Sequence, residues 1–304
     1  MKTKPTDTPL WITLACAAFI APGAWAQEKP FTQPPLITKP PAPPPATVAT
    51  NLTEVFTKGK IGLNALLRYE YADQRGLKES YLGSISTRFG FTTATYEGFQ
   101  AQLEGENITA LTDEDKFNAA GSNGQPGRTV IADPETTEIN QAWISYNKFD
   151  TTAKLGRQRI VLDNWRWVGD VVWRQNRQTY DAMLFQNKSI KNLELIYSYV
   201  WHVNRIFGDV TGLPIANQDL DSNSHLIHAD YTGFKWAKLV GYAYLLDFNN
   251  DLPNAVARNL SSATYGGYAQ GSQVWDKENN GKVNYRGEFA IQTDYGSSTL
   301  NYTA

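Results

Sequence analysis

The feature that most constrains this chain is a period of two in its apolar residues, which begins at Lys60 and recurs to the end of the chain. Alternate side chains of a β-strand point to opposite faces, so each segment predicts a strand with one apolar and one polar face. In the first segment the apolar parity consists of Ile61, Leu63, Ala65, Leu67, Tyr69 and Tyr71. A strand of this length crosses a bilayer when tilted. A soluble β-sandwich strand would show the same alternation, so the pattern alone leaves both classes open.

The lengths of the connections separate these two classes. We count eleven alternating segments and the start of a twelfth at Leu300. Connections after odd-numbered segments are mostly long, namely 110–135, 163–177, 203–223 and 247–262, and those after even-numbered segments are mostly short. Outer-membrane barrels have short periplasmic turns and long external loops. The sequence therefore predicts an all-β chain whose residues 59–304 form an antiparallel transmembrane β-barrel, with 11–12 strands of a larger, truncated barrel present.

The start of the chain predicts export. A basic start precedes an apolar run and a small-x-small cleavage site, so residues 1–26 are expected to be a signal peptide removed near Ala26. The alternative is an uncleaved membrane anchor. Residues 27–58 follow, with eight prolines between Pro30 and Pro45 that favour extended polyproline II geometry. We expect a periplasmic tether here, and the alternative is a ligand for a partner.

Charge and cysteine content exclude several classes of function. Without the two lysines and one aspartate of the signal peptide, 26 basic residues face 29 acidic ones, a net charge of −3. Nucleic acid requires a basic face, so no nucleic-acid partner is expected. The only cysteine, Cys16, lies in the signal peptide, and the chain has no Walker, CxxC or HExxH motif, so we expect no cofactor, no metal and no enzyme. A barrel hydrolase built on Ser224 and His228 is the less favoured alternative.

The polar parity of the predicted strands carries many charges. Burying a charge without a partner is costly, so these side chains must face water or one another. We therefore predict a porin, a water-filled pore for passive diffusion or export of a polar solute, surrounded by outer-membrane lipid. The candidates for its charged lining on the strands are Arg68, Arg88, Arg286, Glu104, Glu106 and Glu288. The alternative is a closed barrel that acts as an adhesin or structural anchor.

Residues 155–185 mix arginine and tryptophan more densely than the rest of the chain. A positive constriction that selects anions is the role expected for Arg157, Arg159 and Arg166, with a bulge near Gly156 turning them inward. The alternatives are pairing with glutamates of the wall and snorkelling at the interface. Stacking on sugar rings is the role considered for Trp165, Trp167 and Trp173, and the alternative is the aromatic girdle of the outer interface.

The role of this stretch depends on the loop within it. Counting strands on both sides places the loop between the fifth and sixth strands, on the external side. Its arginines can act on a solute only if the loop turns into the lumen, and we predict that it does. Asp163 and Asp181 are expected to hold the loop through ion pairs with Arg166 or Arg177.

An ordered set of short motifs runs through the chain: Gly156-Arg157-Gln158, Leu162-Asp163-Asn164, Gln175-Asn176, Gln178-Thr179-Tyr180-Asp181, Thr264-Tyr265-Gly266 and Asp294-Tyr295-Gly296. In this order the motifs resemble the alginate export porin family over roughly residues 60–304. The resemblance implies an outer-membrane β-barrel of roughly eighteen strands. It also implies an arginine-rich lumen that passes an anionic polysaccharide, and hence carbohydrate transport. It fixes neither the substrate nor the oligomeric state.

Overall fold

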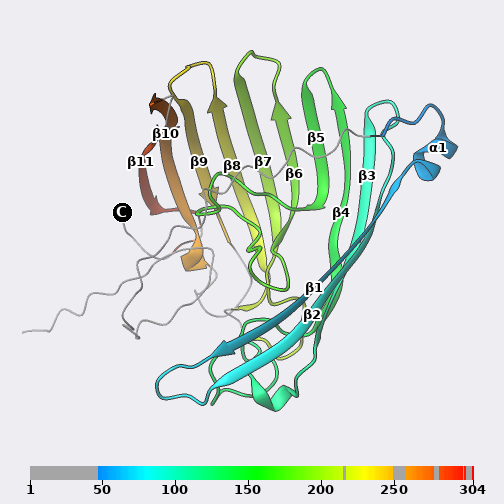
Figure 1. Ribbon diagram of the computed structural model, residues 1–304, viewed down its shortest axis with the longest axis vertical. Coiled ribbons are helices and arrows are strands. Elements are labelled where there is room, and N and C mark those ends of the chain that lie inside the picture. Colours follow the sequence, from blue (N-terminus) through cyan, green and yellow to red (C-terminus); the bar gives the residue numbers. More distant parts are fainter. Residues whose placement is uncertain (1–46, 215–216, 249–257, 277–280, 297, 299–302) are drawn as a thin grey trace, which may run out of the picture.

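The computed structural model describes residues 47–214, 217–248, 258–276, 281–296, 298, 303 and 304. Within them, a single antiparallel sheet of eleven strands follows the order of the chain (Figure 1). The predicted all-β class and strand number are therefore confirmed. The predicted signal peptide, most of the predicted tether and the strand start at Leu300 lie outside the described residues.

One short helix precedes the strands. The elements are α1 (Leu52–Thr57), β1 (Lys60–Ala72), β2 (Ser80–Thr92), β3 (Phe99–Ala110), β4 (Thr136–Lys148), β5 (Thr151–Gln158), β6 (Thr179–Asn187), β7 (Leu193–Asn204), β8 (Leu220–Tyr231), β9 (Lys238–Leu246), β10 (Ser262–Asp276) and β11 (Gly281–Asp294). The sheet curves into a trough, with β1 and β2 on one side and β10 and β11 on the other (Figure 1). Within the described residues β1 and β11 do not pair with each other, so the sheet is open.

Tight turns join several even-numbered strands to the strands that follow them. The β2–β3 turn contains Glu97 (φ 51°) and Gly98 (φ 90°), and the β4–β5 turn contains Phe149 (φ 52°) and Asp150 (φ 53°). Two consecutive residues with positive φ are typical of type I′ turns, whose twist matches that of the paired strands. The long connections leave from the other ends of the strands, as the sequence predicts.

The two faces of the sheet differ in the way that the period of two predicts. On β2, Phe89 is 59% exposed on the convex face, and its neighbour Arg88 is 4% exposed on the concave face. On β3, Leu103 and Glu106 show the same contrast, at 58% and 2%. A convex face of exposed apolar side chains is what the lipid-facing wall of a barrel requires.

The predicted bulge near Gly156 is wrong. The register of β5 with both neighbours runs through Gly156 and Arg157 without a shift, so Arg157 keeps the parity of Leu155. Gly156 instead adopts a φ of 113°, and a Cβ there would lie 2.3 Å from the carbonyl oxygen of Ala142. Only glycine meets both conditions at this position. The register shifts lie in other strand pairs, including β3–β4, β6–β7 and β7–β8.

The end of the predicted tether is bonded to the sheet. The backbone N–H of Glu54 donates to the Asn51 side chain over 3.0 Å, which caps helix α1. Thr47 and Ala49 each share a backbone hydrogen bond of 2.8 Å with Thr95. This segment therefore lies against the turn between β2 and β3. Among the described residues, no helix is long and apolar enough to cross a membrane.

Candidate functional site

The connection between β5 and β6, residues 159–178, is the candidate functional site, and we call it the strap. It lies on the concave side of the sheet (Figure 1). Its side chains and backbone bond to β1, β2 and β4 at one end and to β8, β9 and β10 at the other. The predicted inward fold of this loop is therefore confirmed.

The second half of the strap is bonded to the first strands of the sheet. Arg88 of β2 donates to the carbonyl of Gln175 over 2.6 Å, and the Gln175 amide donates to Ser84 Oγ over 2.8 Å. Asn176 donates to Glu138 Oε1 of β4 over 2.6 Å. Gln175 and Asn176 are fully buried. Buried amides require partners, so these bonds fix this half of the strap against the wall.

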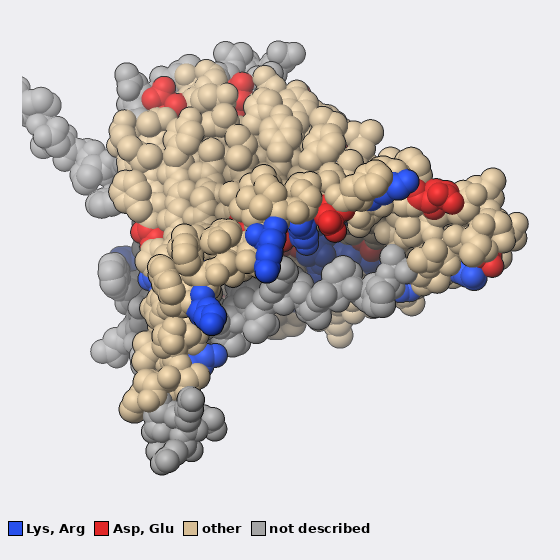
Figure 2. Space-filling model, turned by 90° about the horizontal axis from the view of Figure 1, so that it is seen from above, with Lys and Arg blue, Asp and Glu red and all other residues tan. Residues whose placement is uncertain are grey.

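Ion pairs join the charges around this half. The pairs are Arg88–Glu106, Arg68–Glu70, Arg159–Asp170, and Arg174 with both Glu70 (3.4 Å) and Asp133 (3.5 Å). Seen from above, Lys and Arg side chains gather in the hollow with acidic side chains among them, while the convex side is mostly uncharged (Figure 2). Several of the predicted lining arginines thus pair with carboxylates, which is the alternative that the sequence left open.

Arg177 is a positive group that the sequence did not single out as lining. It is partly buried, and its Nε–H donates no hydrogen bond within the described part of the chain. Burial lowers the pKa of its guanidinium, and the like charges of Arg159 and Arg88 lower it further. The three arginines come from β2 and from both ends of the strap, so only the folded structure brings them together.

The first half of the strap is held by one carboxylate. Asp163 accepts hydrogen bonds from Tyr268 Oη (2.6 Å, β10), His228 Nε2 (3.1 Å, β8) and Tyr244 Oη (3.4 Å, β9). Desolvation alone would raise the pKa of Asp163, but the bonds from His228 and Tyr268 outweigh it and hold the pKa below its ordinary value. The predicted ion pair of Asp163 with Arg166 or Arg177 is wrong.

Aromatic side chains next to Asp163 also join the first half of the strap to the wall. Trp167 Nε1 donates to Tyr242 Oη over 3.3 Å, and Tyr242 donates to Glu288 over 2.9 Å. The rings of Tyr242 and Tyr244 stack with centroids 4.9 Å apart. Arg286 lies 3.6 Å from the ring centre of Tyr268 and pairs with Glu288. This wall is therefore aromatic, whereas the wall at the other end is ionic.

The remaining predicted residues lie away from the strap contacts. Arg157 donates to both carboxylate oxygens of Asp181, over 2.8 and 3.1 Å, so Asp181 does not pair with Arg166 or Arg177 as expected. Glu104 accepts hydrogen bonds from Asn140 and Gln141. These contacts place Arg157 and Glu104 in the network of the wall.

Of the candidate residues on the strap, Arg159, Arg166 and Trp173 are exposed, and Arg159 pairs with Asp170. Arg166 is exposed, stacks on Trp167 at 4.9 Å, and has no ion pair among the described residues. Trp173 is 49% exposed, and Arg68 donates to its carbonyl. Trp165 is partly buried. Arg166 and Trp173 are therefore the strap side chains best placed to meet a solute.

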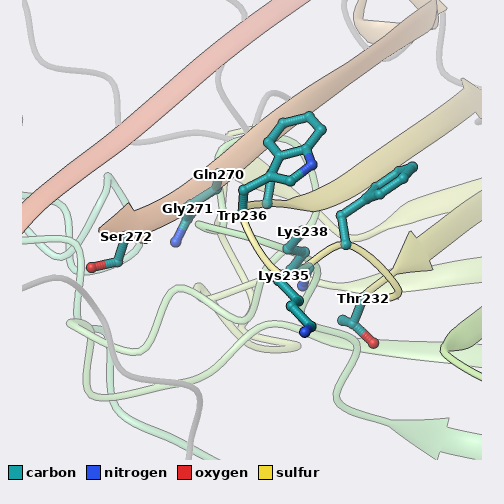
Figure 3. A pocket seen from close by; sticks show the side chains of 9 residues that line it. Thr232, Lys235, Trp236, Lys238, Gln270, Gly271 and Ser272 are labelled. Carbon is teal, nitrogen blue, oxygen red and sulfur yellow. The ribbon is translucent and has the colours of Figure 1, made fainter. Parts of the chain in front are cut away.

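A separate pocket lies at the opposite end of the strands. It has a volume of about 170 Å³ and is formed by the β8–β9 turn and β10, with Lys235, Trp236, Lys238 and Gln270 in its lining (Figure 3). Trp236 stacks on Phe234, with ring centroids 5.3 Å apart. Exposed aromatic residues at strand ends are typical of the girdle at a membrane interface. Two other lining residues contact charged side chains, since Lys238 pairs with Asp230 and Gln270 accepts a hydrogen bond from Arg286.

The histidines do not form a metal site. His225 lies against Tyr197 and Tyr199, while His228 bonds to Asp163 on the other face of β8. Within the described ranges, no group of histidine, cysteine, aspartate and glutamate side chains is arranged to hold a metal ion.

Solved structures with the same fold include OccAB2 of Acinetobacter baumannii, with 13% identity, a TM-score of 0.60, and coverage of 82% of this chain and 62% of that one. OccK9 (OpdG) of Pseudomonas aeruginosa has 11% identity and a TM-score of 0.59, over 82% and 63%. OpdK of Pseudomonas aeruginosa with vanillate has 12% identity and a TM-score of 0.56, over 81% and 61%. The chain thus spans less than two thirds of these outer-membrane β-barrels.

No curated protein matches the sequence. The sequence model of the alginate export family matches residues 60–300, which include the whole described sheet. The matched range covers far more than half of the chain and contains both strap and walls. The chain therefore belongs to the alginate export family.

Proposed function

We propose that the protein is an outer-membrane channel through which polar solutes move past the strap. The observation that carries the proposal is the strap itself, a segment with four arginines held on the concave side of a sheet whose convex face is apolar. Charges are stable inside a barrel when they face water or one another. Membership of the alginate export family supports the same function.

The proposed location is the bacterial outer membrane. Apolar side chains on the convex face suit contact with lipid, and the matched solved structures are outer-membrane barrels. We include in the proposal the removal of residues 1–26 by cleavage near Ala26. The lipid of this membrane is then the constant partner of the convex face.

The proposed solute is anionic and related to carbohydrates. Paired arginines such as Arg88 contribute little net field, whereas Arg166 and Arg177 have no ion pair within the part of the chain that the structure describes. These two guanidinium groups favour an anion. The exposed ring of Trp173 offers an apolar face for a sugar ring. An anionic polysaccharide combines both properties.

A small aromatic carboxylate is the second candidate solute. The solved structure of OpdK holds vanillate. An exposed tryptophan and an unpaired arginine also suit an aromatic ring with a carboxylate, through stacking and charge. Competition between oligomeric uronates and vanillate for blocking the current would distinguish the two solutes.

Reversal potentials in planar bilayers test the proposal. We expect the full-length protein to conduct with a preference for anions, and Arg166→Glu to shift the reversal potential toward cation preference. Lys191→Glu is the matched control, because Lys191 is an exposed lysine on the short β6–β7 turn. It should leave the selectivity unchanged. Silence from folded, heat-modifiable protein would rule out the channel.

A closed barrel remains the competing function, and one observation favours it. The strap packs through Val171 against Ala120 of the β3–β4 connection and Phe207 and Leu213 of the β7–β8 connection. Three long connections thus share one apolar cluster on the same side of the sheet. Swelling of liposomes that depends on the size of an added sugar would exclude the closed barrel.

A further inference from the structure

We propose that Asp163 is a positioning residue, a latch that holds the first half of the strap against the wall and so sets the width of the passage. This inference rests on the proposed channel function. No catalytic or binding role is assigned to Asp163 itself. Its carboxylate acts through the position of the strap, and above all through the position of Arg166.

Asp163 makes most of the hydrogen bonds that join the small loop at the start of the strap to the wall. Backbone hydrogen bonds from Leu162 to Val168 and from Trp165 to Leu162, both 3.1 Å, close a small loop over residues 162–168. Asp163 lies near the base of this loop with a φ of 52°. A non-glycine residue in this left-handed region is uncommon, and the surrounding contacts must maintain it. The carboxylate thereby points at the wall, while Arg166 remains exposed.

Three strands converge on that carboxylate. The donors Tyr268, His228 and Tyr244 belong to β10, β8 and β9, so one side chain gathers hydrogen bonds across the sheet. The strands themselves are held by their own ladder, and they would persist without Asp163. The tyrosines and the histidine therefore keep their positions on the sheet, and the small loop over residues 162–168 is the part that can move.

The other contacts of the first half of the strap fix its orientation less strictly than the hydrogen bonds of Asp163 do. Ile160, Leu162 and Val168 are buried in the apolar cluster with the wall, and apolar contact is not directional. Trp167 adds one hydrogen bond, to Tyr242, at 3.3 Å. Removing Asp163 should therefore leave the strap inside the barrel but let its first half shift. A shift of Arg166 then changes both the aperture and the charge that a solute meets.

Single-channel recording of Asp163→Ala and Tyr268→Phe in the full-length protein tests the latch. We expect both variants to raise the fraction of time that the current spends away from its main level, by about tenfold for Asp163→Ala and less for Tyr268→Phe. We also expect weaker anion preference, because Arg166 no longer has a fixed position. Tyr285→Phe is the matched control, since Tyr285 bonds to the carbonyl of Trp236 at the other end of the strands.

A nitroxide label at Arg166→Cys gives a readout that does not require conduction. The label should gain mobility when Asp163→Ala is added and should not respond to Tyr285→Phe. Unchanged label mobility together with unchanged current fluctuations would overturn the latch. If the parent protein does not conduct but the label is released by Asp163→Ala, the channel function fails and the latch stands as a structural attachment.

Discussion

The two ends of the strap are attached in different ways. At the end near β1–β4, the attachment is spread over several groups, including Arg88, Gln175 and Asn176, and ion pairs surround it. At the end near β8–β10, three donors meet the one carboxylate of Asp163. Trp167 adds one bond there, to Tyr242. A distributed attachment tolerates the loss of one side chain better than an attachment that depends mainly on one carboxylate. The difference makes the first half of the strap the part that can be released alone.

The largest expected effect lies in the distributed end, where Glu106→Gln removes the charge that pairs with Arg88. The two side chains are 0% and 5% exposed, so Arg88 would be left buried without a counter-ion. We expect a loss of about 3 kcal/mol in the free energy of unfolding. Urea titration of the folded, heat-modifiable form measures it. Glu70→Gln is the control, because its partners Arg68 and Arg174 are 26% and 16% exposed and Arg174 keeps its pair with Asp133. An equal loss there would contradict the account.

Asp163→Ala is expected to act locally. It removes three hydrogen bonds to a charged acceptor, so protection of the backbone amides of residues 162–168 should fall by about 2 kcal/mol. Amides of residues 174–177 should keep their protection, because the N–H of Gln175 donates to Asp133 and this half of the strap is held by Arg88 and Glu138. Hydrogen–deuterium exchange with mass spectrometry resolves the two halves. Equal loss in both halves would mean that the strap moves as one unit.

Gln175→Ala tests the attachment of the strap at the end near β1–β4. It removes the bond from the Gln175 amide to Ser84 Oγ, but the bond from Arg88 to the Gln175 carbonyl remains. We therefore expect a loss of about 1 kcal/mol in stability and no change in the main conductance level. Differential urea unfolding and bilayer recording measure the two quantities. Current fluctuations like those of Asp163→Ala would contradict a distributed attachment.

Acidification should have the smallest effect near neutral pH. The pKa of Asp163 lies below its ordinary value of 3.8 in the folded protein, so its contribution to stability is complete above that value and is lost as the pH falls through the lowered pKa. Lys238 is a further positive group near Asp163. Current recordings should therefore be alike at about pH 7 and about pH 5 and become noisy only below about pH 4. Noise that begins between about pH 7 and about pH 5, where Asp163 stays ionised, would contradict control by this carboxylate.

The wall could be predicted from the sequence, and the reason is local. A period of two fixes which side chain lies on which face, so the concave position of Arg88 and the convex position of Phe89 follow from the pattern alone. Alternating short and long connections gave the hairpin order in the same way.

The contacts of the strap could not be predicted, because they join residues far apart in the chain. Asp163 and Tyr268 are hydrogen-bonded but separated by 105 positions in the sequence. No motif near either residue indicates that the two side chains meet. From the sequence we expect Asp163 to form an ion pair with an arginine of its own loop, because a carboxylate is commonly paired with a nearby positive charge. In the structure, the hydroxyl groups of tyrosines and an imidazole provide the hydrogen bonds instead. At Gly156 a glycine suggested a bulge, but the ladder continues through its positive φ.

A cross-linking experiment tests the position of the strap most directly. The only cysteine of the sequence, Cys16, lies in the predicted signal peptide. Once that peptide is removed, introduced cysteines are the only thiols that can react with the reagent. The Gln175 amide donates to Ser84 Oγ over 2.8 Å, whereas Phe89 is exposed on the opposite face of the same strand. We predict that a short bifunctional thiol reagent joins Gln175→Cys to Ser84→Cys in the folded protein and leaves the Gln175→Cys and Phe89→Cys pair unjoined. Failure of the Ser84 pair to react, with Gln175→Cys freely labelled from outside the cell, would contradict a strap inside the barrel.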